Sequence, residues 1–260
     1  MYSDPDFKAL LKESPTSPEW PDLGHRWTPS DINFGERMGI DLANITAEVS
    51  GYKYLGRVPQ SFIYINACDF RTLEFPNLFS VGYAVDTDSS PANVDADASI
   101  TLNNCPNVAS LRFPWLEKVA GDLKVLNFTS LTSALLIFKR LRSVGGDFGF
   151  VGNTNAGITN LVFADPLTTT FAGNVTIAGN THLAAIAGVP HLVFTNGKTL
   201  DFSNNALSVG TVNNILARCV ALGLTTATII LSSGSNAAPA GQGATDKATL
   251  IAAGCTVTTN

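Results

Sequence analysis

Several features that assign function to a sequence are missing from this 260-residue chain. No run of about 18 apolar residues is present, so no membrane-spanning helix is expected. Only 14% of the residues are charged, the net charge is −5 and Lys and Arg form no basic stripe, so nucleic acid is not an expected partner. Cys-x-x-Cys pairs are also absent, and no His cluster lies near a cysteine, so we predict neither a metal site nor a bound cofactor.

The four cysteines are predicted to be packing residues. Cys68 and Cys105 follow similar Asn-containing segments in adjacent repeats, so they either form a disulfide or lie together as two small buried thiols. The second interpretation is favoured. Cys219 belongs to the apolar face of an expected helix, and Cys255 to a core position of an expected strand.

Motifs for catalysis are also lacking. None of the histidines, His25, His182 and His191, stands beside a Ser or Cys nucleophile in a recognised motif. The triplet Gly197-Lys-Thr lacks the first Gly of a phosphate-binding loop and leads into a strand. We therefore predict a non-enzymatic protein without catalytic residues. A polysaccharide-cleaving enzyme stays an alternative, because two stacked repeats can always bring a pair of carboxylates together.

The first residues do not resemble an export signal. Met1-Tyr-Ser-Asp-Pro-Asp-Phe carries acids where a signal peptide has a basic start and an apolar stretch. This favours a virion protein, which is released by lysis. The alternative is that a leader precedes the given residues, as a cell-surface adhesin would require.

What the sequence does contain is a degenerate repeat. Strand-like segments begin at residues 121, 146, 173 and 198, which are 25, 27 and 25 positions apart. Each has apolar residues two positions apart, as at Leu123 and Val125, which is the period of a strand with one buried face. An Asn follows each segment, and we expect these side chains to satisfy buried backbone groups as a structural ladder. The residues concerned are Asn127, Asn153, Asn180 and Asn204.

A second pattern, Leu-x-Phe-x-x-Leu-x-x-Val-x-Gly, lies between these strands. It begins at Leu73, Leu111 and Leu136, and a looser copy begins at Leu161. A unit this short cannot bury its own apolar face, so neighbouring copies must stack around one continuous core. We therefore predict a repeat solenoid with parallel strands stacked on one face, in which the Leu, Phe and Val positions of the pattern are core.

These residues resemble the leucine-rich repeat superfamily, especially its irregular forms in receptor L-domains and bacterial surface proteins. The resemblance covers about residues 60–260 and implies a recognition scaffold without catalytic residues. Residues 231–260 resemble the endings of bacteriophage structural proteins and of some environmental bacterial surface proteins, and we take this resemblance to favour a virion tail component.

The C-terminal repeats are expected to contain two helices. Residues 211–222 have apolar side chains at helical spacing, and Gly223 is a stop signal. A strand at 228–231, a helix at 246–253 and a last strand at 255–257 complete the pattern.

Residues 1–58 do not follow the repeat, so we divide the chain into this irregular N-terminal segment and a solenoid at 59–260. Trp20 and Trp27 lie among several prolines in the segment. They either cap the open end of the solenoid, the favoured interpretation, or dock on a partner protein. The longest insertion, residues 85–98, carries four acids that suit calcium or a solvated loop, and no EF-hand spacing supports calcium. These acids are Asp86, Asp88, Asp95 and Asp97.

The predicted recognition surface is an outward row of side chains that lie between core residues on successive strands, one strand spacing apart. We call it the strand-face row; it comprises Tyr64, Thr101, Lys124, Thr176 and Asp201. It either binds a carbohydrate or protein or is an ordinary solvated face. The sequence thus predicts a binding or structural module, a phage tail or baseplate component in the virion. Its expected partners are other virion proteins, through the N-terminal segment, and a host surface protein or glycan.

Overall fold

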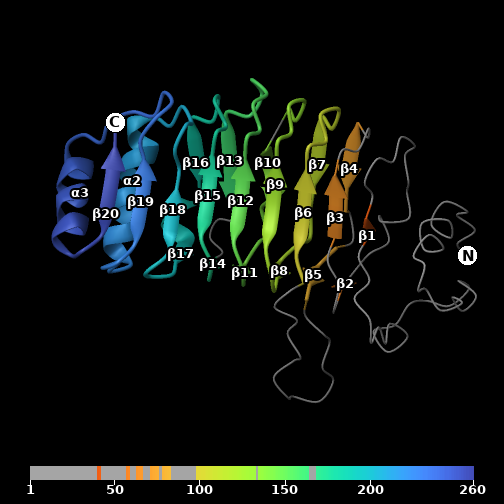
Figure 1. The fold of residues 1–260 in the computed structure, drawn as a ribbon, viewed down its shortest axis with the longest axis horizontal. Helices are drawn as coiled ribbons and strands as arrows, with labels where there is room; N and C mark the ends of the chain where they lie inside the picture. Colours follow the sequence, from red (N-terminus) through yellow and green to blue (C-terminus); the bar gives the residue numbers. More distant parts are fainter. Residues whose placement is uncertain are drawn as a thin grey trace, which may run out of the picture.

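The computed structural model describes residues 40–41, 57–58, 63–66, 71–75, 78–82, 98–132, 134–163 and 168–260. These residues form parallel strands in four stacked sheets, with two α-helices towards the C-terminal end (Figure 1). No helix in this described part is long and apolar enough to cross a membrane.

The largest sheet has nine strands, all parallel, and each successive repeat adds its strand beside the previous one. In spatial order they are β1 (Ile40–Asp41), β3 (Ile63–Asn66), β6 (Ile100–Asn103), β9 (Leu123–Leu126), β12 (Phe148–Val151), β15 (Val175–Ala178), β18 (Thr199–Asp201), β19 (Thr228–Leu231) and β20 (Thr256–Thr259).

Three smaller sheets arise from the chain between those strands, including the Leu-x-Phe pattern, for which the sequence predicted no strand. One contains β17 (Leu192–Phe194), β14 (Thr169–Phe171), β11 (Ser143–Val144), β8 (Lys118–Val119), β5 (Ser80–Val81) and β2 (Arg57–Val58). The second contains β10 (Ala134–Phe138), β13 (Asn160–Phe163) and β16 (Ala185–Ala187), and the third contains β4 (Thr72–Glu74) and β7 (Ser110–Arg112). In Figure 1 the six-stranded sheet runs along the lower edge of the nine-stranded sheet. Strands β10, β13 and β16 lie behind the nine-stranded sheet.

One continuous core fills the space between the sheets, and the repeated positions line it. The Phe of the second pattern is fully buried in every copy, at Phe75, Phe113, Phe138 and Phe163. Rings in neighbouring copies stack, with centroids 4.8 Å apart for Phe75 and Phe113 and 5.8 Å apart for Phe138 and Phe163. Such a pair adds about 0.5–1.5 kcal/mol beyond the burial of its area. The predicted core role of these positions is therefore confirmed.

The Gly of the second pattern is required by the close approach of neighbouring backbones. A Cβ atom on Gly173 would lie 2.4 Å from the Gly146 carbonyl oxygen, and one on Gly146 would lie 2.7 Å from the Gly121 carbonyl carbon. Neither distance is possible for a side chain, so the close stacking of repeats fixes glycine there.

The Asn ladder exists, but it is one residue out of step with the prediction at two positions. Asn153 and Asn180 are fully buried, as predicted, and the next member is Asn205 rather than Asn204. Each Oδ1 accepts a hydrogen bond from the backbone N–H of the corresponding residue in the preceding repeat, as from Asn153 to Asn180 (3.0 Å) and from Asn180 to Asn205 (2.9 Å).

Asn127 and Asn204 are instead exposed and occupy the residue before the ladder, with φ of 61° and 55°. Asn tolerates this left-handed conformation better than other side chains do, which accounts for its presence there. The predicted ladder role of Asn127 and Asn204 is wrong for this reason.

Helices α2 (Val209–Ala221) and α3 (Gln242–Ala252) lie together at the C-terminal end (Figure 1). The Ser208 hydroxyl caps α2 by accepting from the Thr211 N–H, and Gly223 ends the helix with φ of 65°. The second helix, α3, begins four residues earlier than predicted, because the glycines around its start gave no sign of a helix in the sequence. In its first turn the Gln242 side chain donates to the Asp246 carboxylate (2.8 Å).

Several predictions concern residues that lie outside the described part of the chain. These are the roles of Trp20 and Trp27, the Cys68 disulfide and the calcium interpretation of Asp86, Asp88, Asp95 and Asp97. Two short strands, β1 and β2, precede residue 59 and pair in parallel with β3 and β5. The division of the chain at residue 59 stays a prediction.

Candidate functional site

The backbone register aligns the whole strand-face row. Tyr64 pairs with Thr101, and Thr101 with Lys124. Gly149 then pairs with both Lys124 and Thr176, and Thr176 pairs with Asp201. The five predicted residues therefore occupy one row across the nine-stranded sheet, and Gly149 completes it. The side chain of Tyr64 lies outside the described part.

The described side chains of the row are partly exposed. Lys124 extends over Gly149, where an added Cβ would lie 3.2 Å from its Cγ, so the aliphatic stem covers the glycine and explains its burial. The Lys124 ammonium forms an ion pair with Asp122. Asp201 accepts from the Ser203 N–H (2.9 Å). The two charged groups of the row are thus held in place by residues two positions away in the sequence.

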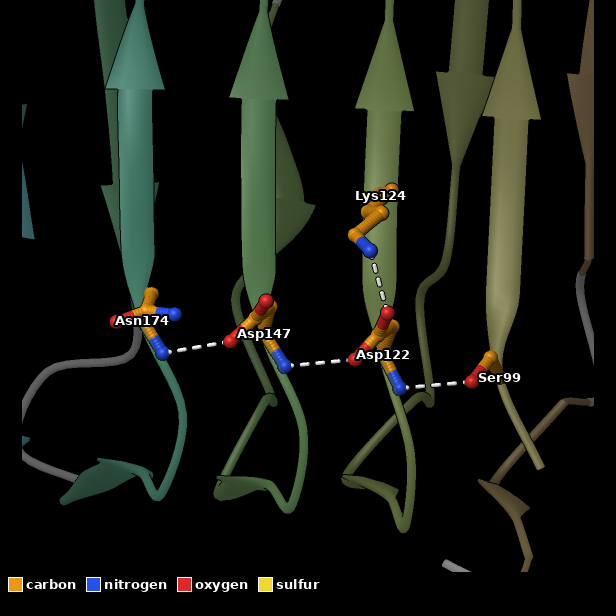
Figure 2. Close-up of polar contacts among 5 residues, drawn as sticks. All are labelled: Ser99, Asp122, Lys124, Asp147 and Asn174. Atoms are coloured by element: carbon orange, nitrogen blue, oxygen red, sulfur yellow. Dashed lines mark hydrogen bonds and ion pairs between the residues drawn. The ribbon is translucent and has the colours of Figure 1, made fainter. Parts of the chain in front are cut away.

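A second row lies where the strands begin, and it fixes the spacing of the repeats (Figure 2). The Ser99 hydroxyl accepts from the Asp122 N–H (2.8 Å), Asp122 Oδ1 from the Asp147 N–H (2.7 Å), and Asp147 Oδ1 from the Asn174 N–H (2.7 Å). We call Ser99, Asp122, Asp147 and Asn174 the start row. Each side chain satisfies a backbone donor that the sheet leaves at its edge.

An apolar row lies on the other side of the strand-face row and was missed from the sequence. Leu126 pairs with Val151, and Val151 with Ala178. Leu126 and Val151 are partly exposed. The signal was present: in these strands two apolar residues follow one another at the end, as in Val125-Leu126, where alternation would place a polar residue.

The three rows together form a strip with a charged or amide edge, a mixed polar centre and an apolar edge. Lys124 and Asp201 are three strand spacings apart, about 14 Å, so a cation and an anion flank a Gly and a Thr along the row. Such a strip can hydrogen-bond and pack against an extended ligand.

The described part of the chain shows no group of three metal-ligating side chains. His182 is exposed, and His191, the last residue of the 3-10 turn Val189–His191, is partly exposed. Asp122 and Asp147 each use a carboxylate oxygen to hold a backbone N–H, which is a structural task.

The three cysteines in the described part of the chain are placed as packing residues. Cys105, Cys219 and Cys255 are buried, and Cys219 and Cys255 are free thiols. Burial, together with the neighbouring Cys255, raises the pKa of the Cys219 thiol from its ordinary value of 9.0 to about 12. A thiol with so high a pKa is a poor nucleophile at neutral pH.

Comparison of the chain with protein-family models, curated proteins and solved structures gives no match.

Proposed function

We propose that this chain is a non-enzymatic binding module, a leucine-rich-repeat-like solenoid that uses the outer face of its nine-stranded sheet for recognition. The observation that carries the proposal is the register that aligns Thr101, Lys124, Thr176 and Asp201 across neighbouring strands. Such a row presents one side chain per repeat to a ligand that lies across the strands.

The hydrogen bonds of the strip support a recognition role. Lys124 is held by Asp122 and Asp201 by the Ser203 N–H, so little side-chain freedom remains to be lost when a ligand binds. The adjoining apolar row, Leu126 and Val151, adds surface that gains free energy when a partner covers it. This combination suits a host surface glycan or protein.

In this proposal the module is a phage tail or baseplate component. The resemblance of residues 231–260 to the endings of phage structural proteins supports that placement. Other virion proteins would bind the N-terminal segment, with Trp20 and Trp27 as anchors, because Trp is favoured at protein interfaces.

Capture experiments with the full chain test both parts. Immobilised protein is exposed to purified virion components and to host-envelope glycans and proteins. We expect Lys124→Ala with Asp201→Ala to reduce host capture at least tenfold and to leave virion capture unchanged. Trp20→Ala with Trp27→Ala should do the reverse.

Lys198→Ala is the matched control. This cation directly precedes β18 and lies outside the row, so its removal should change neither capture. If host ligands bind the double row variant as well as the original chain, the outer face is an ordinary solvated surface. If a captured polysaccharide is cleaved on incubation, the non-enzymatic assignment is wrong.

A further inference from the structure

The segment from β7 to β11 carries a concentration of positive charge that the overall composition conceals. Residues 111–144 contain six Lys and Arg residues and two acids, a net charge of +4, so the other residues of this −5 chain together carry −9. One cation, Lys124, lies in the strand-face row. The other five are all exposed and belong to two neighbouring repeats: Arg112, Lys118, Lys139, Arg140 and Arg142.

An exposed tryptophan lies among these cations. Trp115, in the turn between β7 and β8, is 47% exposed. Arg140 occupies the same position one repeat later, and its guanidinium carbon lies 4.1 Å from the centre of the Trp115 ring. A cation–π contact at an exposed site is worth about 0.5–1 kcal/mol, so Arg140 and the ring hold each other in place.

Glu117 forms ion pairs with both Arg140 and Arg142. Its carboxylate lies 3.9 Å from Nη1 of Arg140 and 3.4 Å from Nε of Arg142. Only 14% of the Glu117 side chain is exposed, against 44% for Arg140 and 47% for Arg142. Because each guanidinium has five N–H donors, the ion pairs leave donors that point to the outside. We call Trp115, Arg140 and Arg142, together with the exposed Arg112, Lys118 and Lys139 of the same two repeats, the cationic corner.

We propose that the cationic corner docks an acidic segment of a protein partner. Its Asp or Glu carboxylates bind Arg140 and Arg142, whose planar groups match a carboxylate, and an apolar side chain of the segment packs beside Trp115. Trp and Arg are also the residues that contribute most to binding energy at protein interfaces. This dock does not depend on the function proposed for the strand-face row.

Size and charge favour a peptide over a nucleic acid or a long acidic polysaccharide. The corner spans two repeats, whose strands are about 5 Å apart, whereas an extended polyanion needs a row of cations along its path. A short acidic segment can lie within the two repeats that carry these cations.

Fluorescence anisotropy with the full chain tests the proposal. The probe is a fluorescein-labelled 12-residue peptide of Glu-Glu-Leu repeats, and its counterpart has Gln in place of Glu. We expect the Glu peptide to bind at least tenfold more tightly than the Gln peptide. Arg140→Gln with Arg142→Gln should weaken binding at least tenfold, and Trp115→Ala about fivefold, since the apolar contact is lost while the charge is kept.

The control is Lys198→Gln with Lys247→Gln, which removes two cations elsewhere and should change affinity less than twofold. Arg140→Lys with Arg142→Lys keeps the charge and guards against misfolding of the Gln variants. It should still lose at least threefold, because Lys lacks the planar fork. Thermal unfolding followed by circular dichroism checks that each variant folds.

Three results would overturn the proposal. The first is failure of the Glu peptide to bind, or equal binding by the Gln variants. The second is tighter binding of dextran sulfate or single-stranded DNA than of the peptide, which would make the corner a general polyanion site. The third is self-association in sedimentation experiments that the Gln variants abolish, which would make the occupant a second copy of this chain.

Discussion

Replacement of Asn205 by Ala would test the hydrogen bonds that tie neighbouring repeats together inside the protein. The side chain is 1% exposed. Its Oδ1 accepts from the Asn180 N–H (2.9 Å), and its Nδ2 donates to the carbonyls of Ile177 (2.6 Å) and Phe202 (2.8 Å). Alanine removes these three bonds and a fourth, which the Asn180 side-chain amide donates to Oδ1 (3.2 Å), and it leaves the buried Asn180 backbone N–H without this acceptor.

The expected loss follows from those bonds. A buried donor that loses its acceptor costs about 1–3 kcal/mol, and each of the two donated bonds contributes about 0.5–1.5 kcal/mol, so the free energy of unfolding should fall by about 2–6 kcal/mol. Urea unfolding followed by far-UV circular dichroism measures this fall. The sequence supplies a matched control one residue away, where Asn204 is exposed with φ of 55°.

Glycine adopts this conformation freely, so Asn204→Gly should cost less than about 1 kcal/mol. Two outcomes would refute the reasoning: a change below about 1 kcal/mol for Asn205→Ala, or an equal loss for both variants.

Other substitutions test the packing. Gly145→Ala should lower the free energy of unfolding by about 1–3 kcal/mol, because its Cβ would lie 2.0 Å from the Ala120 carbonyl oxygen. Gly210→Ala in α2, whose Cβ would meet nothing closer than 3.9 Å, should raise it by up to about 1 kcal/mol; thermal melts of both variants give the comparison. The raised pKa of Cys219 means that the folded state holds this proton more tightly than the unfolded state, so stability should fall as the pH rises from about 9 towards 12. Cys219→Ala should reduce this fall in urea titrations at pH 8 and pH 10.5, and an unchanged pH dependence would contradict the assignment.

The sequence predicted the parts of the fold that depend on local pattern. The alternation at Leu123 and Val125 predicts β9 to within two residues at either end, and the repeat spacing predicts that Thr101, Lys124 and Thr176 align. Strands such as β8 and β11 have two residues each, too few for a period to be seen. They form only because neighbouring repeats supply their hydrogen-bond partners.

The ladder shows how a pattern can be present and still be placed wrongly. Asn153, Asn180 and Asn205 each come three residues after the second residue of the apolar pair in their strand-like segment, whereas Asn127 and Asn204 come two residues after it. One position turns the side chain inwards and the other places the backbone in the left-handed region. A count from the second apolar residue of each segment would have separated the ladder position from the left-handed position.

The cationic corner could not be predicted from local pattern, because its two parts, residues 112–118 and 139–142, belong to different repeats and meet only when the repeats stack. Trp115 and Arg140 become neighbours across that distance. The net charge of the whole chain does not show such a cluster, because the acids of the remaining chain outweigh its positive charge.

The two sets of side-chain hydrogen bonds run in opposite directions, and this bears on how such a chain changes length. In the start row a repeat's side chain accepts from the repeat after it, as Asp122 does from Asp147; in the buried ladder it accepts from the repeat before it, as Asn180 does from Asn153. Deletion of residues 147–173 would place the Asn174 N–H beside Asp122. It would also place the Asn180 side chain beside the backbone donor that Asn153 accepts from in the intact chain. Each donor would again meet an acceptor of the same kind, so whole repeats can be gained or lost in evolution without redesign of the junction.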